Sequence, residues 1–374
     1  MSQPQAINVA IGNHFYGHGI GEILYTLKQF FARLSGRYRV TFSPSLVPDQ
    51  INILIDEFST AGVIAYVQKF KKDYPATKLV LIATEFITPV SFLGRQLGPT
   101  FNFFDPREDR KYAFEILGYQ RGRNKNAPYM YSRFMGFREA MRLVDLVVAV
   151  HPAIIAELPS ISDGVDHWVA PPTDLYPEID APHMALESRL KQRRAGFVMT
   201  GTLTPFRKSI VDKLIKIGHR IGIPNADKTL FAQLPFDHKS AFELRDGSAT
   251  FPFEEAAAEP AKSASAHPDS ADGYLFNLNP PQRANWPFSS PMRILRAVLY
   301  GQIPLVTRKF GDHELEAVAM VWNPDAGVEP FAELWHEATL GRDVLIARHI
   351  SAITDYNDLA KQKNAAVERA LEAL

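Results

Sequence analysis

Short apolar runs alternate with helix-like segments through the first half of the chain. Three of these runs lie at residues 7–12, 51–58 and 78–86, and helix-like patterns separate them. Strands that are mostly apolar and are separated by helices are typical of a parallel sheet that helices cover on both faces. The first half therefore predicts an α/β domain with a parallel sheet.

The same alternation begins again in the second half. An apolar run at residues 197–200 leads through a turn into a helix that carries Ile210, Leu214 and Ile217 on one face. Residues 169–184, between the halves, are rich in proline and acidic residues and show no periodicity, which is typical of a linker. A chain of 374 residues is also longer than one core usually supports. Two domains are therefore expected.

The boundaries follow from these patterns. Residues 246–273 are dominated by Ala, Ser, Pro and Glu, which favours a loop insertion at the surface. The expected parts are a first domain at 1–172, a linker at 173–190, a second domain at 191–345 and a C-terminal helix at 346–374.

Composition excludes several classes of function. The 41 basic and 41 acidic side chains balance, so no global field favours nucleic acid as a partner. With no cysteine, the chain forms no disulfide, thiolate zinc site or cysteine nucleophile, which fits a cytoplasmic location. No apolar stretch approaches the roughly 20 residues that span a bilayer. Residues 27–39 mix phenylalanines with basic residues; a core helix with a basic surface is favoured, and peripheral contact with the inner face of a membrane is the alternative.

A glycine-rich stretch at residues 12–22 directly follows the first apolar run. Gly17, Gly19 and Gly21 stand at alternate positions, where they let the backbone turn tightly and let a ligand approach. The spacing departs from the GxGxxG dinucleotide fingerprint, so a dehydrogenase is disfavoured. His14 and His18 are four residues apart, but the glycines around them argue against the helix that a shared metal would need. No metal site is predicted.

Acid and base candidates lie at the ends of the apolar runs. Glu22 and His14 belong to the glycine-rich stretch, Asp56 lies near the end of the second run and Glu85 near the end of the third. In open parallel sheets, the carboxyl ends of the strands border the ligand crevice. These four residues are therefore candidates for a general base, with an ordinary cap or loop role as the alternative for each.

The turn at residues 201–208 favours a diphosphate. Gly201 and Thr202 end a strand, Thr204 can cap the next helix and Pro205 suits its first turn. Arg207 and Lys208 then place two cations beside N–H groups that lack helical partners. An exposed helix start with ordinary basic residues is the alternative interpretation.

A second turn of the same kind lies at residues 289–293. Ser289 and Ser290 can cap a helix that Pro291 begins, and Arg293 lies in its first turn. Anion binding is chemically reasonable at this helix start as well.

These segments resemble a GT-B-type glycosyltransferase with a family 4-like donor domain. "FVMTGTLTPFRK" resembles the first strand and turn of that domain, and "SPMRILRAVLYGQIPLVT" resembles the helix and strand that hold the donor's ribose and sugar. The resemblance implies two Rossmann-like domains that face each other across a cleft, with the acceptor on the first domain, the nucleotide-sugar donor on the second, and the C-terminal helix crossing back to the first. It implies no cofactor besides the nucleotide-sugar co-substrate.

One departure from that family stands out. Phe288 and Arg296 occupy the positions of its usual pair of glutamates, and Glu314 or Glu316 is expected to take over part of their role. The base, the sugar, the saccharide, lipid-linked or small-molecule acceptor, the stereochemistry and the oligomeric state stay open. A nucleotide-sugar epimerase of the same fold and a non-catalytic nucleotide- or sugar-binding protein are the alternatives.

Overall fold

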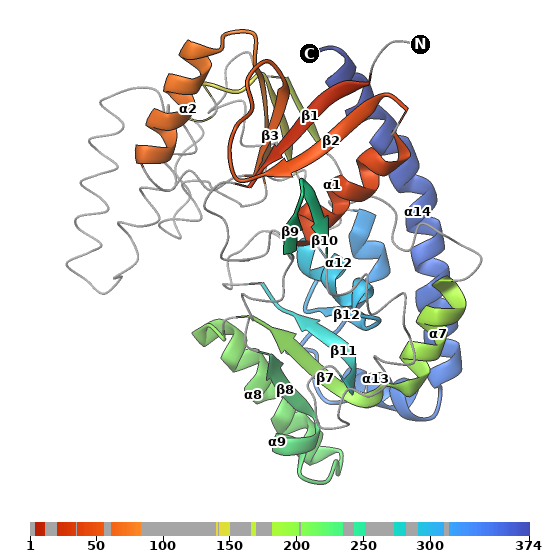
Figure 1. The fold of residues 1–374 in the computed structure, drawn as a ribbon. Coiled ribbons are helices and arrows are strands. Elements are labelled where there is room, and N and C mark those ends of the chain that lie inside the picture. The colour runs from red at the N-terminus through yellow and green to blue at the C-terminus, as the bar shows by residue number, and fades with distance from the viewer. Residues whose placement is uncertain are drawn as a thin grey trace, which may run out of the picture.

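Two parallel β-sheets organise the protein, as shown by a computed structural model (Figure 1). The structure describes the following residues: 4–11, 21–34, 36–55, 61–83, 140, 142–149, 166–169, 182–201, 203–234, 243–250, 273–281, 291–309 and 314–374.

The first sheet has six strands in the order β2-β1-β3-β4-β5-β6, and all neighbours run parallel. The predicted apolar runs form its central strands because apolar side chains on both faces can be buried under helices. The strands are β1 (Gln5–Ala10), β2 (Tyr38–Ser43), β3 (Ile51–Ile55), β4 (Lys78–Ala83), β5 (Leu146–Ala149) and β6 (Asp166–Val169), and the described helices between them are α1 (Gly21–Arg33) and α2 (Ala61–Asp73).

The second sheet has five parallel strands in the order β13-β12-β11-β7-β8. Its strands are β7 (Arg194–Thr200), β8 (Phe231–Leu234), β11 (Tyr274–Asn279), β12 (Ile303–Val306) and β13 (Met320–Val321). Its helices are α8 (Pro205–Arg220), α9 (Ala226–Thr229), α12 (Pro291–Leu299), the 3₁₀ helix η3 (Glu314–Val318) and α13 (Glu329–Thr339). The chain is therefore an α/β protein with two Rossmann-like sheets, as the sequence predicts.

The C-terminal helix α14 (Arg342–Glu372) joins the two halves of the molecule. At 31 residues it is about 46 Å long, and in Figure 1 it runs from α13 to the first sheet. Near its end Glu368 and Glu372 both pair with Arg37, just before β2, and the Glu372 contact measures 2.6 Å. The predicted crossing of the C-terminal helix back to the first sheet is confirmed.

Helix α7 (Pro182–Gln192) occupies the second part of the segment expected to be a linker. Leu186 and Leu190 are four residues apart, so they lie on one face of the helix, and both are fully buried. Helix α14 packs against α7. A short apolar pair between acidic and basic residues gives a weak helical pattern, and the burial that stabilises this helix comes from α14.

A hairpin links the second half of the chain to the first sheet. Strands β9 (Glu243–Arg245) and β10 (Ser248–Thr250) are antiparallel, and Asp246 and Gly247 form the turn with positive φ angles of 51° and 76°. The N–H of Phe42 in β2 donates to the carbonyl of Gly247 at 2.9 Å. The expected loop insertion thus begins within a hairpin, and residues 251–272 lie outside the described parts. In the described residues, no helix is both long enough and apolar enough to cross a membrane.

Candidate functional site

A topological switch point lies between the neighbouring strands β7 and β11 of the second sheet. After β7 the chain passes through α8 to β8 on one side, and after β11 it passes through α12 to β12 on the other. In open parallel sheets, ligands bind outside the carboxyl ends of two strands whose connections diverge in this way (Figure 1). The switch point therefore marks the candidate site. The two turns predicted to favour phosphate, at residues 201–208 and 289–293, follow these two strands in the chain.

The first turn of α8 is built as the sequence predicts. Thr204 caps the helix from an extended conformation, and its hydroxyl accepts a hydrogen bond of 3.3 Å from the N–H of Arg207. Pro205 is the first helical residue. Pro205 has no N–H and that of Arg207 donates to the cap, so the first turn presents the N–H of Phe206 and the positive end of the helix dipole just after the carboxyl end of β7. This arrangement favours an anion.

Arg207 is a buried cation beside this helix start. The side chain is only 2% exposed, and its Nε donates to the carbonyl of Pro280 at 3.3 Å. Pro280 directly follows β11, so Arg207 connects the first turn of α8 to the carboxyl end of the neighbouring strand. Burial lowers the pKa of Arg207 to about 10, which leaves the guanidinium charged at neutral pH. A positive charge is thus held inside the switch point.

Lys208 differs sharply from its neighbour. Its side chain is exposed, and its ammonium pairs with the carboxylate of Asp212 one turn along α8 at 2.7 Å. Consecutive residues of a helix point in directions about 100° apart, so only one of the two can face the sheet. The sequence predicts that both cations bind the diphosphate, but in the structure Arg207 is buried and Lys208 is exposed.

Arg293 and Gly201 come together from segments far apart in the sequence. A Cβ atom added to Gly201 would lie 3.8 Å from Nη2 of Arg293, which is the third residue of α12. Gly201 has a φ of +97°, a region that favours glycine. The Nδ2 of Asn279, at the end of β11, donates to the carbonyl of Arg293 at 3.5 Å. The ends of β7 and β11 and the start of α12 therefore meet at one point.

Sequence reasoning missed two polar residues of this point. Gln233 of β8 donates through Nε2 to the carbonyl of Gly201 at 3.1 Å, and Asn279 is the second. The position of Asn279 could have been noticed in the sequence, because Asn279 and Asn277 are amides within an apolar run. All six residues of that strand are buried. A buried amide in an apolar strand needs specific partners, and so it often marks a constrained position.

Several predicted residues of the donor side lie outside the described parts, namely Thr202, Ser289 and Ser290. Glu314 begins η3, but its side chain is not among those described. Glu316 lies in the same 3₁₀ helix and is buried. The roles expected for these residues stay predictions.

The first sheet has a switch point of its own, between β1 and β3. After β1 the chain passes through α1 to β2, and after β3 it passes through α2 to β4 on the other side. Gly21 and Glu22 begin α1, although only the backbone of Glu22 is described. The other predicted residues of this edge, namely His14, Gly17, Gly19, Asp56 and Glu85, lie outside the described parts.

The two sheets are connected close to these sites. Helices α1 and α12 each follow a switch-point strand of their own sheet, and they contact each other. In the described parts of the chain, no group of three or more His, Cys, Asp or Glu side chains is placed to hold a metal ion.

Comparisons with known proteins give similarities of structure only. No family model matches the sequence, and no curated protein matches it. WaaG, a glycosyltransferase involved in lipopolysaccharide biosynthesis, is 13% identical with a TM-score of 0.43, and 95% of each chain is covered. MnaA of S. aureus, solved with UDP, is 11% identical with a TM-score of 0.39, and 99% of this chain and 98% of that chain are covered.

A chain of the Glycosylation Associate Protein (Gap123) complex from Streptococcus agalactiae is 11% identical with a TM-score of 0.40. The match covers 93% of this chain, which spans 57% of that chain's length. Similarity at this level assigns no activity. The fold class stated above follows from strand order and direction in the two sheets.

Proposed function

We propose that the protein is a GT-B-type glycosyltransferase that binds a nucleotide-sugar donor at the carboxyl ends of β7 and β11. The acceptor binds at the switch point of the first sheet. The acceptor is a saccharide, a lipid-linked molecule or a small molecule, and the cytoplasmic location expected from the sequence belongs to the same proposal. Arg207 carries this proposal.

The position of Arg207 favours a bound anion. Burial penalises the charged guanidinium, and the positive end of the α8 dipole repels a cation in the first helical turn. A bound diphosphate would offset both terms, because it adds negative charge beside the cation and the helix N–H groups. A buried cation and a helix start at the same place therefore support an anionic ligand.

The same groups suit the chemistry of glycosyl transfer. Negative charge develops on the leaving nucleoside diphosphate as the bond to the sugar breaks, and preorganised cations and helix dipoles stabilise that charge. Arg207 and Arg293 would supply the cations, and the start of α8 would supply the N–H of Phe206 and the positive end of its dipole. For an inverting reaction, one of Glu22, His14, Asp56 and Glu85 would act as the base for the acceptor hydroxyl.

Binding of nucleoside diphosphates by calorimetry tests the proposal. The test measures UDP, GDP and ADP against the wild-type protein and the variants Arg207→Met, Arg293→Met and Lys208→Met. We expect one of the three nucleotides to bind, and we expect the two arginine variants to weaken it by about tenfold or more, as for a charged hydrogen bond. Lys208→Met is the matched control; it should change affinity by less than about twofold because Lys208 is exposed and paired with Asp212.

Stability of the free protein separates a ligand role of Arg207 from a structural one. If Arg207 serves an anion, Arg207→Met should weaken nucleotide binding at temperatures where the free variant is fully folded. If Arg207 serves only its contacts within the protein, among them the one with Pro280, the variant should lose stability and keep its affinity. If none of the three nucleoside diphosphates binds, the proposal is overturned.

Turnover then distinguishes the remaining alternatives. A transferase releases nucleoside diphosphate from the donor in an acceptor-dependent manner. An epimerase of the same fold converts the donor sugar with no acceptor present, and a binding protein does neither.

A further inference from the structure

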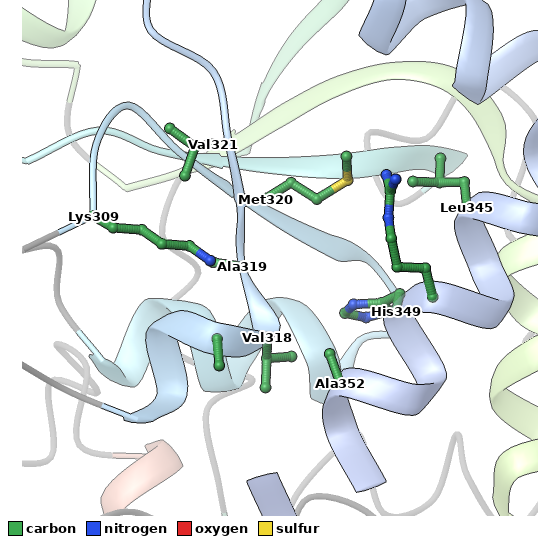
Figure 2. Close-up of a pocket in the computed structure, with 10 residues that line it drawn as sticks. Lys309, Val318, Ala319, Met320, Val321, Leu345, His349 and Ala352 are labelled. Carbon is green, nitrogen blue, oxygen red and sulfur yellow. The ribbon is translucent and has the colours of Figure 1, made fainter. Parts of the chain in front are cut away.

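A pocket lies at the edge of the second sheet, away from the switch point. It is formed between η3, the edge strand β13 and the first turns of α14, and its volume is about 270 Å³ (Figure 2). Strands β11 and β12 separate β13 from β7 in the sheet order. The pocket is therefore distinct from the candidate donor site, and its volume suits a ligand smaller than a nucleotide-sugar.

The lining of this pocket is mainly apolar, with positive charge and without acidic residues among the side chains described. Its residues are Lys309, Ala317, Val318, Ala319, Met320, Val321, Leu345, Arg348, His349 and Ala352. Such a lining disfavours a cationic ligand. It suits a molecule with an apolar body and a negative charge.

His349 is the buried polar group of the pocket. The side chain is 4% exposed, and neither ring nitrogen makes a full hydrogen bond with a described residue. Burial lowers the pKa of His349 to about 4, and the nearby backbone of Val318 offsets only part of this effect. The imidazole is therefore neutral, and a neutral ring has one donor and one acceptor nitrogen. In Figure 2 it points from α14 toward Val318.

The two cations of the pocket are not equivalent. Arg348 already forms two hydrogen bonds with the carboxylate of Glu337, of 3.1 and 2.8 Å. Lys309 is exposed and forms no ion pair with any residue in the described parts of the chain. In Figure 2 its side chain extends toward Ala319. Lys309 is thus the cation available to a ligand.

We infer that this pocket binds a small carboxylate that has an apolar body and a second polar group. The carboxylate accepts hydrogen bonds from the ammonium of Lys309, and the apolar body packs against Val318, Met320 and Leu345. The second polar group bonds with the imidazole of His349, whose own contact with the backbone of Val318 falls short of hydrogen-bond geometry. A phosphate fits less well, since its oxygens need more donors than one ammonium and one neutral imidazole supply. This inference does not depend on the proposed transferase activity.

Three matched probes test the two ends of the ligand separately. The probe 4-hydroxybenzoate carries both polar groups, benzoate lacks the hydroxyl, and 4-hydroxybenzamide lacks the charge. Methyl NMR of methionine-labelled protein gives a local readout, because Met320 lines the pocket and the chain has only 8 methionines. The variant Met320→Leu assigns its signal.

We expect 4-hydroxybenzoate to shift the Met320 signal saturably and to bind about two- to fivefold more tightly than either analogue, as one hydrogen bond or one exposed ion pair would give. Lys309→Met should remove the preference over the amide, and His349→Phe should remove the preference over benzoate. Ala352→Leu should weaken all three probes because it fills the pocket. Lys216→Met, an exposed lysine of α8, is the matched control and should keep both preferences.

The outcomes are decisive in both directions. A saturable shift with both preferences, each lost in its own variant, supports the proposal. Absence of a saturable shift with every probe overturns the proposal. Equal affinities for the acid and the amide, or preferences that survive in Lys309→Met and His349→Phe, also overturn it. Circular dichroism of each variant confirms that a lost shift does not arise from unfolding.

Discussion

Mild acid should destabilise the protein through His349. Burial lowers the pKa of this imidazole from 6.5 to about 4 in the folded state. At pH values above 6.5, the imidazole is neutral in both the folded and the unfolded protein, so His349 adds no pH dependence to the stability. Below it the unfolded chain takes up a proton that the folded protein excludes, and stability falls as the pH decreases from 6.5 toward 4.

The size of this effect follows from the same two values. At about pH 5, the pH is roughly 1.5 units below the pKa of His349 in the unfolded chain, but it is still above the pKa of His349 in the folded protein. Each unit corresponds to about 1.4 kcal/mol, so His349 alone lowers the free energy of unfolding by about 2 kcal/mol between pH 7.5 and pH 5. The group is fully buried, so solvent screening does not reduce this value.

Urea unfolding followed by tryptophan fluorescence measures the effect, since Trp322 directly follows β13 and is 1% exposed. His349→Gln should remove the contribution, so the stability difference between wild type and variant should shrink by about 2 kcal/mol on acidification. The control His219→Gln changes an exposed histidine of α8 and should run parallel to the wild-type protein. If the curve of His349→Gln is also parallel to that of the wild type, the reasoning about burial is wrong.

Three further substitutions test the fold and the candidate site, each by urea unfolding. Thr204→Ala removes the cap of α8 and should cost about 1 kcal/mol; it should also weaken nucleoside diphosphate binding, whereas unchanged affinity would separate the cap from the site. Gly196→Ala should cost at least about 2 kcal/mol, because the new Cβ would lie 2.4 Å from the Tyr274 ring at a φ of +143°; Gly36→Ala, with no atom within 4 Å of its new Cβ, is the control and should be near neutral. Leu190→Ala should cost about 3 kcal/mol if α7 is part of the core, whereas a linker role predicts almost no change.

Most of the sheet structure could be predicted from the sequence because its signal is local. The runs that form β1, β3, β4, β7 and β12 are apolar enough to require burial on both faces. Strands β6 and β8 were not predicted because polar residues interrupt their apolar pattern, namely Asp166 and His167 in β6 and Gln233 in β8. Helix α7 was also missed, because it packs against α14, which is far away in the sequence. Elements that depend on a distant partner leave a weak pattern in their own residues.

The candidate site divides in the same way. The cap by Thr204 involves residues three positions apart, and the sequence predicted it correctly. The approach of Gly201 to Arg293 and the bond from Arg207 to Pro280 join residues 73 or more positions apart. The roles predicted for the glycine-rich stretch and for the acids of the first sheet stay predictions.

Helical periodicity could still have predicted that Arg207 is buried and that Lys208 is exposed. The buried residues of α8 are Arg207, Ile210, Val211, Leu214, Ile217 and Gly218, so the apolar stripe extended back by three positions arrives at Arg207 and not at Lys208. The chain thus places a cation where the helix pattern calls for an apolar residue. Periodicity therefore identifies Arg207, rather than Lys208, as the cation of this turn that faces the buried side of α8.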